Sequence, residues 1–293
     1  MSLRHAELEC IEALALGGAS EVHLARRRLA DGRFQRVVVK RAREPDDVEH
    51  ALLLRDEGRL LARLSHPGVI GLVSSGEDAR GPFLVLDHVD GVTLRRLTLA
   101  ARASSAPALL VGRVLLDVAE ALTYLHDQAD PVVHRDLTPS NVLADVAGHA
   151  RLIDFGIAYA GGRVYETGTG VIKGTIGYMA PEQLEGRSDA GSATDVFALG
   201  VCAHEALAGR HPFLPVDPLT LERRVRGAEF PPLGGRVAVP AALAAMLDRA
   251  LAPDPAARPT AREVADALRP WVGGVSRADV GALVVRSQLA PAL

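Results

Sequence analysis

The chain has 293 residues, of which 48% are hydrophobic and 24% are charged, and its formal net charge is −3. These proportions are those of an ordinary globular protein, so they exclude a disordered chain and a fibrous repeat. The net negative charge argues against a nucleic-acid partner, because that binding needs a basic field that neutralises phosphates.

The N-terminal and the most apolar segments give no sign of export or membrane insertion. Glu7 and Glu9 lie where a signal peptide would be hydrophobic. Residues 106–125 form the most apolar stretch, and charged residues in a bilayer would be costly. Three charged residues interrupt it: Arg113, Asp117 and Glu120. We therefore expect a soluble, cytoplasmic protein with no membrane insertion.

The first 90 residues have the pattern of a small sheet with one helix. Asp31-Gly32 is a strong signal for a hairpin turn. Leucines recur at helical spacing over residues 48–64, which predicts a helix there. Five segments are predicted strands: residues 11–16, 21–27, 34–40, 69–73 and 83–86. The first three of these segments, separated by short turns, predict an antiparallel meander.

After Asp90-Gly91 the pattern becomes mainly helical. Four segments are predicted helices: residues 109–125, 194–208, 241–252 and 260–268. The second of them is apolar on nearly every face, which fits a buried helix, and Thr194 is its expected N-cap. Residues 272–293 are expected to be a C-terminal tail. A strand-rich half followed by a helix-rich half predicts the α+β class.

Three short motifs follow one another in the second half. His134-Arg135-Asp136-Leu137-Thr138-Pro139-Ser140-Asn141 is followed, after a short hairpin-like stretch, by Asp154-Phe155-Gly156 and then by Ala180-Pro181-Glu182. With these motifs in this order, the sequence resembles the protein kinase superfamily, in particular the eukaryotic-like serine/threonine kinases.

The resemblance covers residues 9–271 and implies a bilobal protein kinase fold. A small antiparallel β-sheet lobe with one main helix would span about residues 9–88. A larger, mainly helical lobe would span about residues 89–271. Residues 1–8 would be an N-terminal extension.

The resemblance assigns catalytic roles to five residues. Asp136 would accept or orient the proton of the attacking hydroxyl. Asn141 and Asp154 would be the metal ligands, because Mg²⁺ prefers hard oxygen atoms; Mn²⁺ is an alternative. Lys40 would hold the α and β phosphates of ATP, paired with Glu57. Taken alone, Lys40 is an ordinary strand-end lysine and Glu57 a solvated helix residue.

An ATP pocket between the lobes is implied as well. The residues expected to contact ATP are Leu14, Gly17, Gly18, Val22, Val38, Lys40, Asp87, Val89 and Leu143. Backbone groups of Asp87 and Val89 would hydrogen-bond the adenine, and Leu86 would be the gatekeeper. These assignments follow the family alignment, because apolar residues by themselves are core by default.

Two places depart from the family pattern. The phosphate-covering loop has Ala15 and Ser20 in place of its first and last glycines, which should stiffen it. Thr138 stands where serine/threonine kinases usually carry a lysine near the transferred phosphate. The loss of that charge lowers the rate unless Lys173 or a water-bridged hydroxyl of Thr138 compensates for it.

Other residues would support or regulate the site. Asp195 resembles the family's aspartate that anchors the catalytic-loop backbone, and Arg258 would pair with Glu182. Thr167 and Thr169 are candidate phosphorylation sites in the segment that precedes Ala180-Pro181-Glu182. An unmodified loop is an equally weighted alternative there.

The main functional hypothesis is a serine/threonine protein kinase. It would transfer the γ-phosphate of ATP, with Mg²⁺, to hydroxyls of protein substrates, and it would autophosphorylate. The alternative is a pseudokinase that acts as an ATP-binding scaffold or sensor, because of the altered glycine loop and Thr138. A small-molecule kinase is a third hypothesis, disfavoured because such relatives generally lack the Ala-Pro-Glu segment.

Overall fold

The protein is seen in a computed structural model that describes residues 8–16, 20–44, 47–156, 176–187, 190–214 and 216–289. The chain divides into two compact units, Met1–Val89 and Asp90–Leu293. The first unit is built on an antiparallel sheet and the second is mainly helical, which confirms the predicted α+β class.

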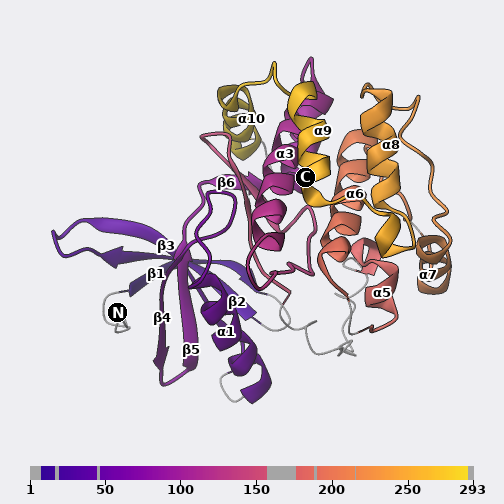
Figure 1. Ribbon diagram of the computed structural model, residues 1–293. Helices are drawn as coiled ribbons and strands as arrows, with labels where there is room; N and C mark the ends of the chain where they lie inside the picture. The colour runs from indigo at the N-terminus through magenta and orange to yellow at the C-terminus, as the bar shows by residue number, and fades with distance from the viewer. Residues whose placement is uncertain are drawn as a thin grey trace. The chain divides into compact units, whose positions relative to one another are not determined.

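The first unit contains a five-stranded antiparallel sheet with the order β1-β2-β3-β5-β4 (Figure 1). Its strands are β1 (Leu8–Leu16), β2 (Ser20–Arg28), β3 (Phe34–Ala42), β4 (Leu72–Asp78) and β5 (Gly81–Asp87). The predicted turn joins β2 to β3: Gly32 has φ 83°, and the amide of Leu29 donates to the carbonyl of Arg33. Glycine adopts this left-handed conformation at little cost, which explains why Asp31-Gly32 forms the turn after β2.

One helix, α1 (Val48–Leu61), contacts β3 and β5. The side chain of Asp47 caps its first turn by accepting from the amide of His50. The helix ends three residues before the predicted end, because the amide of Leu64 donates to the carbonyl of Leu61 in a tighter turn. The core cluster of the sheet consists of five apolar residues: Ala25, Val37, Val39, Phe83 and Val85.

The predicted strand at residues 69–73 was placed too early in the sequence. Val69 and Ile70 are buried, but they belong to the loop before β4, and the strand runs from Leu72 to Asp78. Most of β4 is polar because it is an edge strand, hydrogen-bonded on one side only. Hydrophobicity therefore marked the buried loop and only the first two residues of the strand.

The second unit combines a small sheet with helices. The sheet has the order β6-β7-β8, with β6 (Gly91–Thr93), β7 (Val142–Asp145) and β8 (Ala150–Leu152). The helices are α2 (Leu94–Ala101), α3 (Pro107–His126), α5 (Pro181–Leu184), α6 (Ser192–Ala208), α7 (Pro218–Arg226), α8 (Ala241–Ala250), α9 (Ala261–Trp271) and α10 (Arg277–Leu289). Short 3₁₀ turns lie at Ile176–Tyr178 and Pro255–Ala257.

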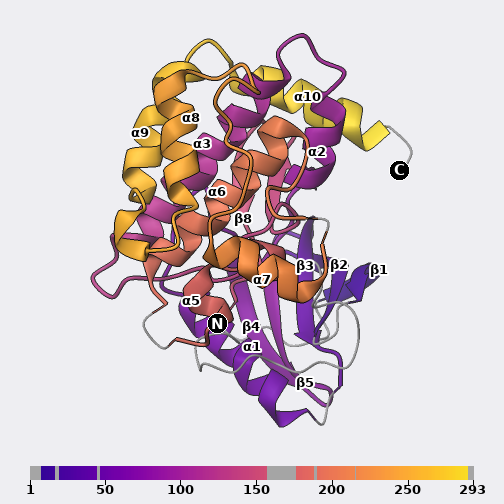
Figure 2. The same ribbon diagram turned by 90° about the vertical axis from the view of Figure 1, so that its right-hand side faces the viewer.

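Helices α3, α6, α8 and α9 lie side by side in both views of the second unit (Figure 1, Figure 2). Gly112 on α3 allows close packing there, since a Cβ at this position would lie 2.3 Å from Trp271 Cζ3 on α9. The α6 helix is buried over most of its length, as its apolar sequence predicted. Among the described residues, no helix combines the length and the apolar character needed to cross a membrane.

Some sequence predictions for this unit were incomplete or wrong. The N-cap of α6 is Gly191 rather than Thr194, whose hydroxyl donates to Glu182 instead. Helices α2 and α7 were not predicted. The segment after Trp271, expected to be a tail, contains the thirteen-residue helix α10.

The half-buried ring of His211 makes the second unit sensitive to acid. Its Nδ1 accepts from the amides of Phe213 and Leu214 at 3.1 and 3.2 Å, so that nitrogen must be deprotonated. Burial, together with the charge of Arg95, lowers the pKa of His211 to about 4. The unfolded chain therefore binds a proton that the folded chain does not, once the pH falls below about 6.5.

We expect the free energy of unfolding to fall as the pH drops from about 6.5 towards about 4, by up to about 1.4 kcal/mol per pH unit from this residue. His211→Asn keeps an oxygen acceptor for both amides but does not titrate, so its pH dependence should be shallower. Urea unfolding between pH 4 and 8 measures the slope. An unchanged slope in the variant contradicts this account.

Candidate active site

Lys40 on β3 and Glu57 on α1 form a buried ion pair in the first unit. The ammonium Nζ of Lys40 donates to both carboxylate oxygens of Glu57, each at 2.8 Å. Lys40 lies opposite Leu84 of β5, and a Cβ at Gly58 would lie 2.7 Å from Leu84 Cδ2. The missing side chain at Gly58 therefore lets α1 approach the sheet closely enough for Glu57 to reach Lys40. The predicted ion pair is confirmed.

Two of the predicted ATP-contacting valines share a sheet face with Lys40. Val22 lies directly opposite Lys40 across β2 and β3, and Val38 lies opposite Leu86 across β3 and β5. Opposite residues in a sheet, and residues two apart in a strand, point to the same face. Val22, Val38 and Lys40 therefore lie on one face of this sheet.

The other predicted ATP-contacting residues lie at several places in the two units. Leu14 on β1 is 49% exposed, and the amide of Asp87 at the end of β5 donates to the carbonyl of Gly71 at 2.9 Å. Val89 is the last residue of the first unit, while Leu143 lies on β7 of the second. Gly17 and Gly18 lie outside the described residues.

In the second unit, Asn141 and Asp136 are joined by hydrogen bonds. The amide nitrogen Nδ2 of Asn141 donates to the Oδ2 of Asp136 at 2.9 Å and to its carbonyl oxygen at 2.8 Å. The backbone amide of Asn141 donates to the carbonyl of Thr138 at 3.0 Å, which closes the loop. With its nitrogen turned to Asp136, Asn141 directs its amide oxygen elsewhere.

The segment around Asp154 is fastened to the same loop. The amide of Ile153 donates to the carbonyl of Asn141 at 3.0 Å, and the amide of Gly156 donates to the carbonyl of His134 at 2.8 Å. The fully buried ring of His134 hydrogen-bonds the carbonyl of Ile153 at 3.0 Å and lies 4.7 Å from the ring of Phe155. Residues on both sides of Asp154 are thus tied to the loop that carries Asp136 and Asn141.

Arg135 and Asp154 have left-handed backbones, with φ 64° and φ 55°. A non-glycine residue in this conformation costs about 1–3 kcal/mol and persists only where its surroundings hold it. The amide of Arg135 donates to Asp195 Oδ1 at 2.8 Å, and its carbonyl accepts from Gln183 Nε2 at 2.9 Å. The amide and the carbonyl of Arg135 are therefore both held by hydrogen bonds, directly before Asp136 in the chain.

Asp195 on α6 is the main anchor of this loop. Its fully buried carboxylate accepts from the amides of His134 and Arg135 at 2.8 Å and lies 2.9 Å from Nε2 of His126. Burial would raise the pKa of Asp195, but the interactions with His126 and His134 lower it below its ordinary value. Asp195 is therefore held as a carboxylate, and its predicted anchoring role is confirmed.

Glu182 and Arg258 form the predicted buried pair. Nη1 of Arg258 donates to Oε1 of Glu182 at 2.6 Å, and Nη2 donates to Oε2 at 2.8 Å. Thr194 adds a hydroxyl donor to Oε1 at 3.0 Å. Burial opposes the charge of Glu182, but these partners bring its pKa below the ordinary value. The pair fixes the start of α5 against α6.

The contacts of two supporting residues, Gln183 and Tyr178, were not predicted from the sequence. Gln183, which holds the carbonyl of Arg135, directly follows Glu182 and has no distinguishing pattern of its own. The hydroxyl of Tyr178 donates to Glu205 and accepts from Arg95. Burial raises the pKa of Tyr178, so this hydroxyl stays protonated as a donor. The only sequence feature that pointed to Tyr178 was its position directly before Met179-Ala180-Pro181.

The structure describes one of the remaining predicted residues, Thr138. Thr138 is 8% exposed, so its side chain is buried in the loop where the family usually has a lysine. The candidate phosphorylation sites Thr167 and Thr169, and the candidate replacement cation Lys173, lie outside the described residues.

Comparisons with known proteins agree with this arrangement. The protein kinase domain family matches residues 8–272. The chain is 38% identical over 277 residues to tyrosine-protein kinase MasK of Myxococcus xanthus, covering 89% of this chain and 42% of that protein. It is 35% identical over 272 residues to serine/threonine-protein kinase PknB of Mycobacterium tuberculosis, covering 88% and 42%.

A third relative is serine/threonine-protein kinase PknL of Mycobacterium bovis, 36% identical over 222 residues, covering 74% of this chain and 53% of that protein. The chain thus spans about two fifths of the length of MasK and PknB, at 42% of each. The family match extends over most of the chain, and its range includes Lys40, Glu57, Asp136, Asn141 and Asp154. The chain therefore belongs to the eukaryotic-like serine/threonine protein kinase family.

Proposed function

We propose that this chain is an ATP-dependent protein kinase that phosphorylates serine and threonine. The observation that carries the proposal is the single hydrogen-bonded framework that contains Asp136, Asn141 and the segment of Asp154. Phosphoryl transfer asks little covalent chemistry of a protein, and depends on positioning and charge stabilisation. A framework that ties the loop of Asp136 and Asn141 to the segment of Asp154 suits that task.

The residues of the second unit fit a divalent metal. Asn141 turns its amide nitrogen to Asp136, so its oxygen is available as a ligand, and Asp154 supplies a carboxylate. Mg²⁺ is usually held by one or two such protein ligands, with phosphates and water completing its shell. When bound, the metal would neutralise charge on the triphosphate.

Each remaining residue has a role in the transfer. Lys40, held by Glu57, would bind the α and β phosphates as a fixed positive charge. Asp136 would orient the acceptor hydroxyl and take its proton while the hydroxyl oxygen bonds to the γ-phosphorus. The bond from the γ-phosphorus to the β–γ bridging oxygen breaks, and ADP leaves.

Tyrosine as acceptor is a second candidate, because the relative MasK is named a tyrosine-protein kinase. The names of PknB and PknL support serine and threonine. An ATP-binding scaffold without transfer is a third candidate, supported by the buried Thr138. The presence of the buried Lys40–Glu57 pair and of Asp136 favours transfer.

The test is phosphate transfer by the purified chain, with radiolabelled ATP, Mg²⁺ and a mixture of acceptor proteins. We expect labelled phosphoserine and phosphothreonine, and no label after chelation of the metal. Label on tyrosine alone would assign the second candidate. Nucleotide binding without any transfer would assign the scaffold. Mass spectrometry of the chain itself tests autophosphorylation at Thr167 and Thr169.

Glu57→Gln should lower kcat/KM for ATP by about 10- to 100-fold. The substitution removes the charged partner of Lys40, and a hydrogen bond to a charged group is worth about 1.5–3 kcal/mol. Steady-state kinetics with varied ATP measure the effect. Glu77→Gln is a matched control, since Glu77 pairs with Arg55 at an exposed site of the same unit. Equal losses in the two variants contradict the role of Glu57.

A further inference from the structure

Helix α10 lies beyond the part of the chain that the kinase family matches, which ends at residue 272. It packs against α2, α3, β6 and β7 in the second unit. One face of the helix is buried, through Val280, Gly281, Leu283, Val284 and Ser287. A helix with this much buried surface is part of the folded unit, and its contacts include β7, the first strand of the β7–β8 hairpin.

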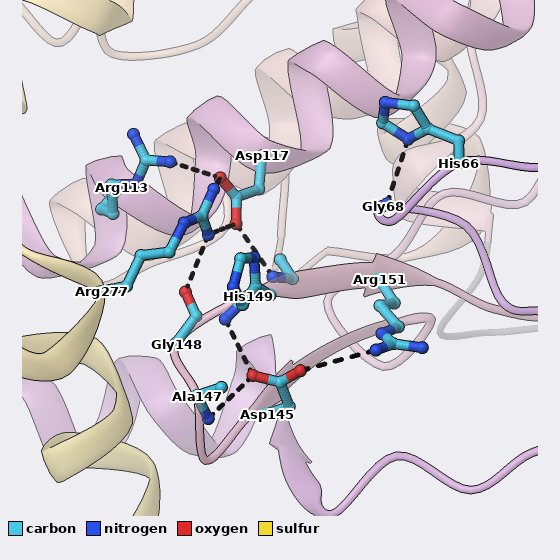
Figure 3. A network of polar contacts seen from close by, with 11 residues as sticks. His66, Gly68, Arg113, Asp117, Asp145, Ala147, Gly148, His149, Arg151 and Arg277 are labelled. Carbon is cyan, nitrogen blue, oxygen red and sulfur yellow. Dashed lines mark hydrogen bonds and ion pairs between the residues drawn. The ribbon is translucent and has the colours of Figure 1, made fainter.

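Arg277, the first residue of α10, joins the helix to this hairpin (Figure 3). Its guanidinium donates to Asp117 of α3 at 2.7 and 3.2 Å and to the carbonyl of Gly148 in the hairpin turn at 3.2 Å. The same carboxylate of Asp117, 6% exposed, accepts from the amide of Ala150 at 3.0 Å and from Arg113 at 2.9 Å. Asp117 therefore links α3, α10 and the first residue of β8.

The backbones of α10 and the turn are in direct contact. A Cβ at Gly281 would lie 2.3 Å from the carbonyl oxygen of Val146. Gly148 has φ 82°, and a Cβ there would lie 2.0 Å from the carbonyl oxygen of Arg277. Neither position has room for a side chain, so the helix and the turn are fitted to each other over two glycines.

The far end of α10 is also fastened. The guanidinium of Arg96 on α2 donates to the carbonyl of Ser287 at 3.0 and 2.5 Å, which satisfies a carbonyl of the last helical turn. Gln288 donates to Asp90 at 2.8 Å, and the carbonyl of Asp90 accepts from the amide of Val146 in the hairpin turn at 3.0 Å. The helix is therefore held at both ends, directly to the turn by Arg277 and indirectly to it through Asp90 at the far end.

The hairpin connects the two proposed metal ligands. Asn141 directly precedes β7, and Asp154 follows β8 by two residues. The side chain of Asp145 accepts from the amides of Ala147 and His149 at 3.0 and 2.9 Å, which makes the turn compact (Figure 3). We expect a displacement of this turn to move the ends of both strands.

We propose that α10, through Arg277 and Gly281, is a positioning element that holds the β7–β8 hairpin and with it the spacing of Asn141 and Asp154. This positioning role rests on the proposed function, because it concerns the metal ligands of the transfer site. Arg277 would act through the turn and would touch neither nucleotide nor metal.

The test is the Mg²⁺ dependence of nucleotide binding in the full chain, followed by the fluorescence of a labelled ATP analogue. We expect Arg277→Ala to raise the Mg²⁺ concentration for half-maximal binding about tenfold, the lower end for changes outside the ligands themselves. Hydrogen exchange should become faster at residues 142–153. Arg277→Lys keeps a cation beside Asp117 and should recover part of the loss. Gly281→Ala should act like Arg277→Ala, by pushing the helix from Val146.

Two matched controls make the outcome decisive. Arg113→Ala also removes a guanidinium from Asp117, but Arg113 contacts neither the turn nor α10 in the contacts described, so Mg²⁺ dependence should stay at the wild-type value. Gly274→Ala adds a methyl group where nothing lies within 4 Å. Wild-type Mg²⁺ dependence and exchange in both Arg277→Ala and Gly281→Ala overturn the proposal, as does an equal loss in Arg113→Ala.

The outcome is independent of the transfer assay. If the wild-type chain binds Mg²⁺ and nucleotide without transferring phosphate, a raised Mg²⁺ requirement in Arg277→Ala still supports the positioning role. If the chain transfers phosphate and the two α10 variants behave as wild type, the positioning role is wrong and the proposed function stands.

Discussion

Asp136→Asn is expected to lower kcat by about 10²- to 10⁴-fold, the range that a positioned general base contributes. The change replaces one carboxylate oxygen by an NH₂ group and removes the capacity to take a proton. An amide oxygen can still accept from Nδ2 of Asn141, so the hydrogen bond that closes the loop is retained. The KM for ATP should change little, because Asp136 is assigned to the acceptor hydroxyl.

Steady-state kinetics with saturating ATP and Mg²⁺ measure this loss, with circular dichroism to verify the fold. Asp266→Asn is a matched control, because Asp266 is exposed and pairs only with Arg269 one helical turn away in the contacts described. It should have wild-type kcat. A kcat for Asp136→Asn within about threefold of wild type would mean that the proton goes elsewhere, and the assigned role of Asp136 would be wrong.

The sequence predicted those parts of the site in which residue type alone defines the chemistry. Asp195 and the pair of Glu182 with Arg258 were predicted from the resemblance to protein kinases, and the structure shows their contacts. Long apolar helices such as α3 and α6 could also be predicted, since their buried faces give a continuous periodic pattern of apolar residues in the sequence.

Other parts were hidden because tertiary contacts define them. No sequence pattern marks the left-handed backbones of Arg135 and Asp154, since neither residue is glycine. The conformation of Arg135 is held by Asp195 and Gln183, which lie far along the chain. Helix α10 was missed because its buried face contains Gly281, which lies against the neighbouring turn, and Ser287, whose hydroxyl donates to the carbonyl of Leu283; both weaken the apolar pattern.

Arg258→Ala is expected to lower the free energy of unfolding by about 3–5 kcal/mol, because it leaves the buried carboxylate of Glu182 without its cation. The Arg258 side chain is fully buried, and it also donates to the carbonyls of Ala252, Ala193 and Pro253. Those acceptors would lose their donor as well, so the loss should lie at the upper part of the range. Acidification to protonate Glu182 should narrow the difference from wild type.

Urea unfolding followed by the fluorescence of Trp271, the single tryptophan of the chain, measures this loss within the second unit. Arg262→Ala is the matched control: Arg262 pairs with Asp127, but the two side chains are 63% and 55% exposed, and such pairs contribute about 1 kcal/mol or less. A loss in Arg258→Ala no larger than that of Arg262→Ala would show that Glu182 is stabilised without its partner. The buried pair would then fix the position of α5 relative to α6 without contributing to the stability of the unit.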